Sequence, residues 1–281
     1  MKERAYGKIN LSLDVFHIRE DGYHDLRSIM LPIDFYDELE IRIADHDSYL
    51  CNRSFLAFDE RNSIVKMMKV LKERFGIDDH YEIRLNKQIP TQAGLGGGTA
   101  DAAATLKIFE KMYDLHLSRE EIIEICLKVG ADVPFNYFNV PALVTGIGDG
   151  IEEIDMKKDY DVLLVKPWKG VSTAEAYRLL DMERCDHPDI DRLKDALAKG
   201  EDLTGLLGNS LEQPAVLLNR QIAEIKEKMK ALGAKNVLMS GSGSTLFSIG
   251  EEKQKMKELC EAMRRQRYYV RFTKTLKREI V

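Results

Sequence analysis

The sequence lacks the features that mark secreted, membrane-spanning and nucleic-acid-binding proteins. Its four cysteines are far apart and form no C-x-x-C pair, so neither a disulfide framework nor a metal site is expected. No apolar run approaches the ~20 residues that a transmembrane helix needs, and the first residues do not resemble a signal peptide. A net charge of −5 disfavours a nucleic-acid partner. We therefore expect a cytoplasmic protein that binds neither membranes nor nucleic acid.

The composition is that of a globular protein. Hydrophobic residues make up 44% and charged residues 32% of the 281 residues, enough to bury a core in one large domain or two ordinary ones. Alternating polar and apolar residues predict a strand over 8–15, and helical spacing predicts helices over 62–75 and 99–112. Strands and helices are interspersed without βαβ regularity, which predicts an α+β fold. A polar segment at 156–159 suggests two domains, 1–157 and 158–281.

The most informative segment is a glycine-rich turn. Four glycines lie within the five positions 94–98, between a predicted strand and an alanine-rich predicted helix. Glycines let the chain turn tightly and expose several N–H groups, and the helix start adds a positive dipole end. Together they suit phosphate binding. The segment is not a Walker A loop, because the sequence G-x-x-x-x-G-K-[ST] is absent. It is also not a dinucleotide-binding fingerprint, because Thr99 occupies the position of the third glycine. A turn with only a packing role is the alternative.

This turn resembles the phosphate-binding motif of the GHMP kinases, a superfamily that includes galactokinase, homoserine kinase and mevalonate kinase. Further segments resemble those members that act on 4-diphosphocytidyl-2-C-methyl-D-erythritol. They are Lys8-Ile9-Asn10-Leu11 with Asp21-Gly22-Tyr23-His24, Gly130-Ala131-Asp132-Val133-Pro134-Phe135, and Met239-Ser240-Gly241-Ser242-Gly243-Ser244-Thr245. Their order and spacing agree with that group over essentially the whole chain.

The resemblance implies a fold and a reaction. The expected fold has an N-terminal domain like domain 2 of ribosomal protein S5 and a ferredoxin-like C-terminal domain, with the active site between them. The implied reaction transfers the γ-phosphate of ATP to the 2-hydroxyl of the methylerythritol unit, in non-mevalonate isoprenoid biosynthesis. The expected cofactors are ATP and Mg²⁺, the partner is the small-molecule substrate, and the expected state is a monomer or weak homodimer.

The resemblance also assigns roles to residues. Asp132 becomes the general base, and Lys8 the cation that keeps a nearby carboxylate ionised. Without the resemblance, the alternative for Asp132 is a helix C-terminal or turn aspartate, and the alternative for Lys8 is a solvent-exposed strand lysine. The nucleotide phosphates are assigned to the turn and its flanks, namely Pro90, Gly94, Leu95, Gly96, Gly97, Gly98, Thr99 and Ala100.

A third set of residues is assigned to the substrate. Its members, from three parts of the chain, are Asn10, Tyr23, His24, Thr173, Tyr177, Gly241 and Gly243. Aromatic rings would stack on cytosine, and the glycines would let the backbone approach the diphosphate. The alternatives are an ordinary hairpin turn at 21–24, an amphipathic helix position for Tyr177 and a β-turn at 241–243.

Two departures from the family pattern leave other functions open. The family turn carries two serines where this chain has Thr99 and Ala100, and a Gly-Gly pair after Phe135 is replaced by residues 138–141. A kinase of the same superfamily with another small alcohol as substrate is one alternative. A non-catalytic nucleotide-binding protein is the other.

Overall fold

The computed structural model describes residues 1–20, 22–250 and 252–277. The chain forms two compact units that are interleaved in sequence. Unit 1 consists of Met1–Gly7, Phe35–Pro90 and Gly96–Asn139, and unit 2 consists of Lys8–Asp34, Thr91–Leu95 and the chain from Val140 onward. One crossing between the units falls inside the glycine turn, between Leu95 and Gly96. The α+β prediction is confirmed, because both units combine sheets with packed helices.

The polar segment at 156–159 does not separate the two units. It lies within unit 2, where Met156 is buried and the Lys157 N–H donates to the Leu197 carbonyl at 3.0 Å. The division of the family domains at 157/158 stays a prediction.

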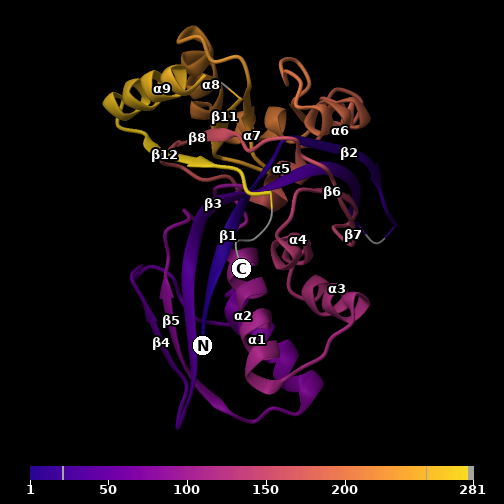
Figure 1. Ribbon diagram of the computed structural model, residues 1–281, viewed down its shortest axis with the longest axis vertical. Coiled ribbons are helices and arrows are strands. Elements are labelled where there is room, and N and C mark those ends of the chain that lie inside the picture. The colour runs from indigo at the N-terminus through magenta and orange to yellow at the C-terminus, as the bar shows by residue number, and fades with distance from the viewer. Residues whose placement is uncertain (21, 251, 278–281) are drawn as a thin grey trace. The chain divides into compact units, whose positions relative to one another are not determined.

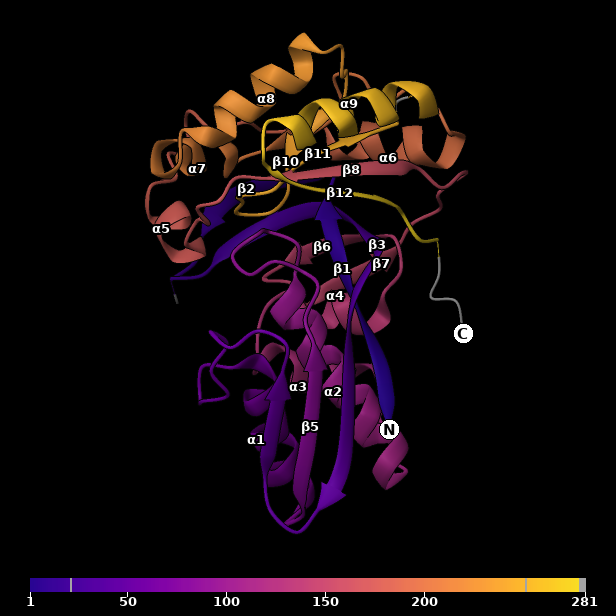
Figure 2. The same cartoon turned by 90° about the vertical axis from the view of Figure 1, so that its left-hand side faces the viewer.

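Unit 1 is a sheet with helices packed against it (Figure 2). The second half of the long strand β3 (His24–Ala44) pairs antiparallel with β5 (His80–Asn86), which pairs in parallel with β4 (Ser48–Cys51). The helices are α1 (Ser63–Phe75), α2 (Gly97–Tyr113), α3 (Arg119–Leu127) and α4 (Val133–Phe138). Strand β1 (Lys2–Asn10) pairs with β3, and both strands continue into unit 2.

Local signals fix the ends of these helices. Asn62 caps α1 by accepting the Ile64 N–H at 2.9 Å, and Gly76 ends the helix in the left-handed conformation. Ser118 and Glu121 form the capping box that opens α3. The predicted apolar face of α1, which is Ile64, Met67, Met68 and Leu71, is buried in the core of unit 1.

Unit 2 contains an antiparallel four-stranded sheet in the order β10-β11-β8-β12. Its strands are β8 (Asp161–Lys166), β10 (Val237–Met239), β11 (Leu246–Ile249) and β12 (Tyr269–Lys274). Helices α8 (Gln221–Ala231) and α9 (Lys253–Arg265) lie over this sheet (Figures 1 and 2). Their methionines Met229, Met256 and Met263 are buried in the core between them and the strands.

The first half of β3 organises the remaining strands of unit 2. It pairs antiparallel with β2 (Ser12–Ile18) and with β6 (Ala142–Gly146). Strand β2 also pairs in parallel with β9 (Gly208–Asn209), and β6 pairs antiparallel with β7 (Gly150–Glu153). Helices α5 (Thr173–Arg178), α6 (Ile190–Lys199) and α7 (Glu212–Leu218) complete the unit. The single strand predicted over 8–15 is divided at Leu11 into β1 and β2. Within the described ranges, the protein has no helix long and apolar enough to cross a membrane.

Candidate active site

In unit 1 the glycine turn opens directly into α2. Gly96 is the N-cap of the helix and has a left-handed φ of 68°. A Cβ on Gly97 would lie 2.8 Å from the Ile89 side chain and 3.1 Å from the Lys87 ammonium, so the first helical residue has no room for a side chain. The N–H groups of a helix's first turn have no acceptor within the helix and lie at its positive end. This part of the turn therefore has the geometry that binds phosphate.

Thr99 connects the start of α2 with the start of α4. Its hydroxyl lies 2.8 Å from the Asn136 side-chain oxygen and 2.9 Å from the Gly96 carbonyl. The Asn136 amide donates to the Tyr6 carbonyl at 3.1 Å, which fixes α4 against β1 within unit 1. Asp132 lies at the N-cap of α4, one helical turn before Asn136. Unit 1 thus brings Thr99 and Asp132 to neighbouring helix starts.

A buried cluster of charged side chains lies next to the glycine turn. The Lys87 ammonium contacts the carboxylates of Asp37 and Asp101, at 2.5 and 2.6 Å. Asp37 also accepts the N–H groups of Gln88 and Ile89. Burial disfavours the charge on Lys87, but the two aspartates outweigh it and raise its pKa. Burial raises the pKa of Asp101 to about 7, against the lowering effect of Lys87. The cluster anchors the strand and the helix on either side of the turn.

In unit 2 the first residues of the turn pack against the 240–243 loop. Gly94 has a φ of 72°, and a Cβ there would lie 1.9 Å from the Ser240 carbonyl oxygen. The Ser240 hydroxyl donates to the Gly94 carbonyl at 2.8 Å, and the Thr245 N–H donates to the Ala93 carbonyl at 3.1 Å. Only glycine at position 94 allows this close approach.

Lys8 and Asn10 lie together on one face of β1. The Lys8 ammonium donates to the Asn10 side-chain oxygen at 2.7 Å, and the Asn10 amide donates to the Ser28 hydroxyl at 2.9 Å. A Cβ on Gly241 would lie 3.2 Å from the Lys8 nitrogen and 3.3 Å from the Asn10 oxygen. Lys8 is only 3% exposed, so its interpretation as a solvent-exposed strand lysine is wrong. A buried ammonium beside a glycine loop is suited to hold an anionic oxygen.

The aromatic residues predicted to bind the substrate also meet within unit 2. The rings of His24 and Tyr177 lie 4.9 Å apart, and burial lowers the pKa of His24, so the neutral ring can both donate and accept at neutral pH. Thr173, at the start of α5, shares a hydrogen bond of 2.7 Å with the Ser242 hydroxyl. Tyr23 is 60% exposed. Asp21, in the same predicted turn, lies outside the described residues.

Three predicted nucleotide residues have little side-chain surface to offer. The side chains of Leu95 and Ala100 are buried and Pro90 is half-buried, and the Ala100 N–H donates to the Gly96 carbonyl at 2.8 Å. The roles of these three residues in nucleotide binding stay predictions.

Comparison with known proteins identifies the family. Residues 62–146 match the GHMP kinases N terminal domain and residues 182–270 match the GHMP kinases C terminal domain. The chain is 39% identical over 280 residues to a protein of Clostridium beijerinckii named 4-diphosphocytidyl-2-C-methyl-D-erythritol kinase, covering 98% of this chain and all of that one. This chain belongs to the GHMP kinase family.

Two further relatives support this membership. A 4-diphosphocytidyl-2-C-methyl-D-erythritol kinase of Bacillus velezensis is 42% identical over 272 residues, covering 93% of this GHMP kinase and 92% of the relative. The crystal structure of a 4-(cytidine 5'-diphospho)-2C-methyl-D-erythritol kinase superposes with a TM-score of 0.82 at 29% identity, covering 98% of this chain and 99% of that one. The two-domain GHMP kinase fold expected from the sequence is thereby confirmed.

Sequence reasoning missed several residues of this GHMP kinase's candidate site. Asp37, Lys87 and Asp101 surround the turn, Asn136 binds Thr99, and Ser240 binds Gly94. Lys87 and Asp101 flank the glycine turn in sequence, which was a signal that could have found them. Asp37 and Asn136 gave no such signal, because their contacts join segments that are far apart along the chain.

Proposed function

We propose that this GHMP kinase is an ATP-dependent kinase that phosphorylates the 2-hydroxyl of 4-diphosphocytidyl-2-C-methyl-D-erythritol. The observation that carries the proposal is the glycine turn at Gly94–Gly98, where no side chain fits at Gly94 or Gly97 and the chain continues into α2. The relatives of Clostridium beijerinckii and Bacillus velezensis, named as kinases of this substrate, support the choice of acceptor.

The turn is proposed to hold the phosphates of ATP through main-chain N–H groups. The segment fits a phosphate because Gly97 leaves no side chain in the way and the helix dipole favours negative charge there. When bound, ATP supplies the phosphoryl group and Mg²⁺ the counter-charge. The described residues contain no cluster of three or more His, Cys, Asp or Glu side chains able to hold a metal, so the phosphates are proposed to carry most of the Mg²⁺ coordination. Thr99 contributes a hydroxyl at the edge of the turn.

The acceptor is proposed to bind to unit 2 through side chains. His24 and Tyr177 would hold the cytosine, with the neutral imidazole offering a donor and an acceptor to the base edge. Tyr23 would add a stacking surface, and Asn10 and Thr173 would supply polar contacts. The glycines Gly241 and Gly243 are proposed to let the backbone of their loop approach the diphosphate.

Asp132 and Lys8 are proposed to act on the reacting hydroxyl. Asp132 would accept its proton at a carboxylate oxygen, a step typically worth about 10²–10⁴-fold in rate. Lys8, buried and fixed by Asn10, would stabilise the negative charge that develops on the oxygen as the proton leaves.

The remaining expectations belong to the same proposal. A kinase of this kind would act in the cytoplasm as a monomer or weak homodimer and without nucleic-acid or membrane partners. Gel filtration with light scattering at several protein concentrations tests the oligomeric state.

The function is tested with 4-diphosphocytidyl-2-C-methyl-D-erythritol and MgATP. We expect release of ADP and a product whose new phosphate is coupled to the 2-carbon in ³¹P and ¹³C NMR spectra. The Lys8→Ala variant should lose turnover by orders of magnitude while it still binds an ATP analogue. A Lys2→Ala variant, altered at an exposed lysine of the same strand, is the control. Turnover with mevalonate or homoserine but not with the cytidine substrate would contradict the proposal.

A further inference from the structure

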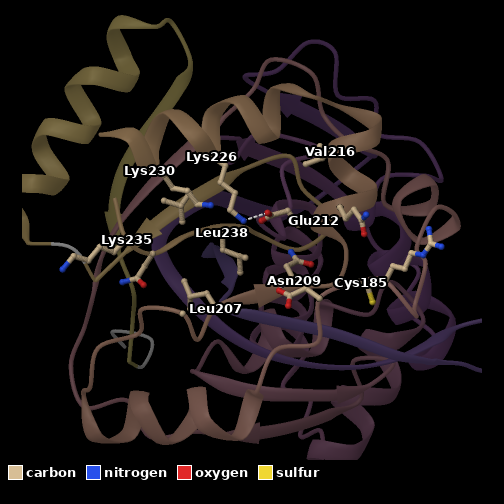
Figure 3. A pocket seen from close by; sticks show the side chains of 15 residues that line it. Cys185, Leu207, Asn209, Glu212, Val216, Lys226, Lys230, Lys235 and Leu238 are labelled. Carbon is tan, nitrogen blue, oxygen red and sulfur yellow. Dashed lines mark hydrogen bonds and ion pairs between the residues drawn. The ribbon is translucent and has the colours of Figure 1, made fainter. Parts of the chain in front are cut away.

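Unit 2 contains a cavity of about 690 Å³ that the proposed reaction does not use. Figure 3 shows it between α8, α7 and β10, and 15 residues line it. None of the residues predicted to bind nucleotide or acceptor is among them. The volume is in the range of pockets for small-molecule ligands.

The lining of this cavity is cationic, although the whole chain has a net charge of −5. Four of its side chains are cationic and two are anionic, namely Arg184, Lys226, Lys230 and Lys235 against Asp186 and Glu212. Apolar side chains also line the cavity, namely Leu207, Val216, Val237 and Leu238. The cavity is thus suited to an anion that also carries some apolar surface.

The two lysines of α8 are placed to bind one ligand together. Lys226 and Lys230 lie four residues apart and therefore on the same face of the helix, and Figure 3 shows them side by side near Glu212. Lys226 is ion-paired with Glu212, and both side chains are largely buried. Lys230 is 49% exposed and its partner Glu227, at 3.4 Å, is 73% exposed, so that pair contributes little and a ligand can replace it.

We propose that this cavity binds a small phosphate- or diphosphate-bearing molecule, at a site separate from those of the nucleotide and the acceptor. Two ammonium groups from one helix match the several oxygens and multiple charge of a phosphate group.

The same cavity walls hold the base of the 240–243 loop. The Glu212 carboxylate that pairs with Lys226 also accepts the Met239 N–H at 3.0 Å. The Asn209 amide donates to the carbonyls of Met239 at 2.7 Å and Gly241 at 2.8 Å. A bound anion would share Lys226 and repel Glu212, which weakens the hold on Met239. If the proposed function is right, the ligand therefore raises the KM for the acceptor, and this regulatory step rests on that function.

Binding is tested with inorganic pyrophosphate, by calorimetry on the full-length protein with a saturating non-hydrolysable ATP analogue and without added Mg²⁺. We expect the Lys226→Met/Lys230→Met variant to bind pyrophosphate at least about tenfold more weakly than the unaltered protein, because two charged hydrogen-bond donors are lost. The control is Lys253→Met/Lys257→Met, which removes the same charge at the same spacing from exposed positions of α9. It should change the affinity less than about twofold. Equal affinity in all three proteins overturns the proposal.

Lys226→Met leaves Glu212 without its ion-pair partner and can lower stability. The single variant Lys230→Glu alters a half-exposed residue, keeps that pair, and should also weaken pyrophosphate binding. These measurements need no enzyme activity, so they stand apart from a failure of the proposed kinase reaction. In kinetic assays, pyrophosphate should raise the acceptor KM about tenfold in the unaltered protein and less than about twofold in Lys230→Glu. An equal rise in both proteins would place the effect at the acceptor site and contradict the regulatory role.

Discussion

The two units prepare their candidate binding residues by different physical means. In unit 1 the turn is shaped by absent side chains and held from behind by the buried cluster of Lys87, Asp37 and Asp101. In unit 2 several of the predicted acceptor residues offer side chains that are held by contacts between uncharged groups, such as Thr173 with Ser242 and His24 with Tyr177. Phosphates are common to all nucleotides and can be held by backbone, whereas a particular acceptor must be distinguished by side chains. Substitutions in the two units should therefore affect different steps.

The largest effect is expected at Asp132 in unit 1. Asp132→Asn keeps the shape of the side chain but cannot accept the proton, so turnover should fall about 10²–10⁴-fold while affinity for an ATP analogue is retained. Steady-state kinetics and calorimetry measure the two quantities. Asp114→Asn, at the exposed C-cap of α2, is the matched control and should be active. Near-normal turnover of Asp132→Asn would show that Asp132 is not the general base.

Opposite effects on stability are expected at the two ends of the glycine turn. Gly94→Ala, in unit 2, places a Cβ 1.9 Å from the Ser240 carbonyl at a positive φ, and should destabilise the fold by about 1–3 kcal/mol. Gly98→Ala, in α2 of unit 1, meets only the Ser63 hydroxyl at 3.3 Å and should be neutral or stabilise by up to about 1 kcal/mol. Chemical denaturation compares the two variants. Equal losses in both would mean that the close approach at Gly94 is not what excludes a side chain there.

Acceptor affinity should depend on unit 2 alone. Tyr177→Ala removes the ring beside His24, and should raise the KM for the cytidine substrate about tenfold, since stacking on a base contributes about 1–3 kcal/mol. The KM for ATP should stay within about twofold. Tyr268→Ala removes a tyrosine from another part of unit 2, where it contacts Lys228, and serves as the control. A similar rise in the KM for ATP and in the KM for the cytidine substrate would contradict the assignment of acceptor binding to unit 2 alone.

A pH dependence of stability is expected to arise in unit 1. Burial raises the pKa of Asp101 to about 7, above the value of about 4 of an aspartate in an unfolded chain. The folded state therefore keeps this proton over a range in which the unfolded state releases it. Stability from this group is full below about pH 4 and is lost as the pH rises towards 7.

Asp101→Asn should remove this fall in stability, and the exposed Asp78→Asn should leave it unchanged. Denaturation midpoints measured between pH 4 and 8 compare the variants with the unaltered protein. A fall of the same size in Asp101→Asn would assign the pH dependence to another group.

Much of this protein was determined locally by its sequence. The helical period of 62–75, the Ser118–Glu121 capping box and the glycine turn each specify structure within a few residues, and all three are present. Local signals were weaker where a short element depends on its neighbours. Helix α4, which was not predicted, has only six residues and is held by contacts of Asn136 with Thr99 and Tyr6.

Tertiary structure alone decided which residues meet. It buried Lys8 against Asn10, placed Ser240 on Gly94, and gathered Asp37 to the charge cluster behind α2. It also interleaved the two units, so that the glycine turn belongs to both. The physical reason is the distance along the chain over which each interaction acts. Backbone propensity and capping act within a turn of helix, whereas burial of a charge and close approach of two backbones depend on segments that fold next to one another from distant parts of the chain.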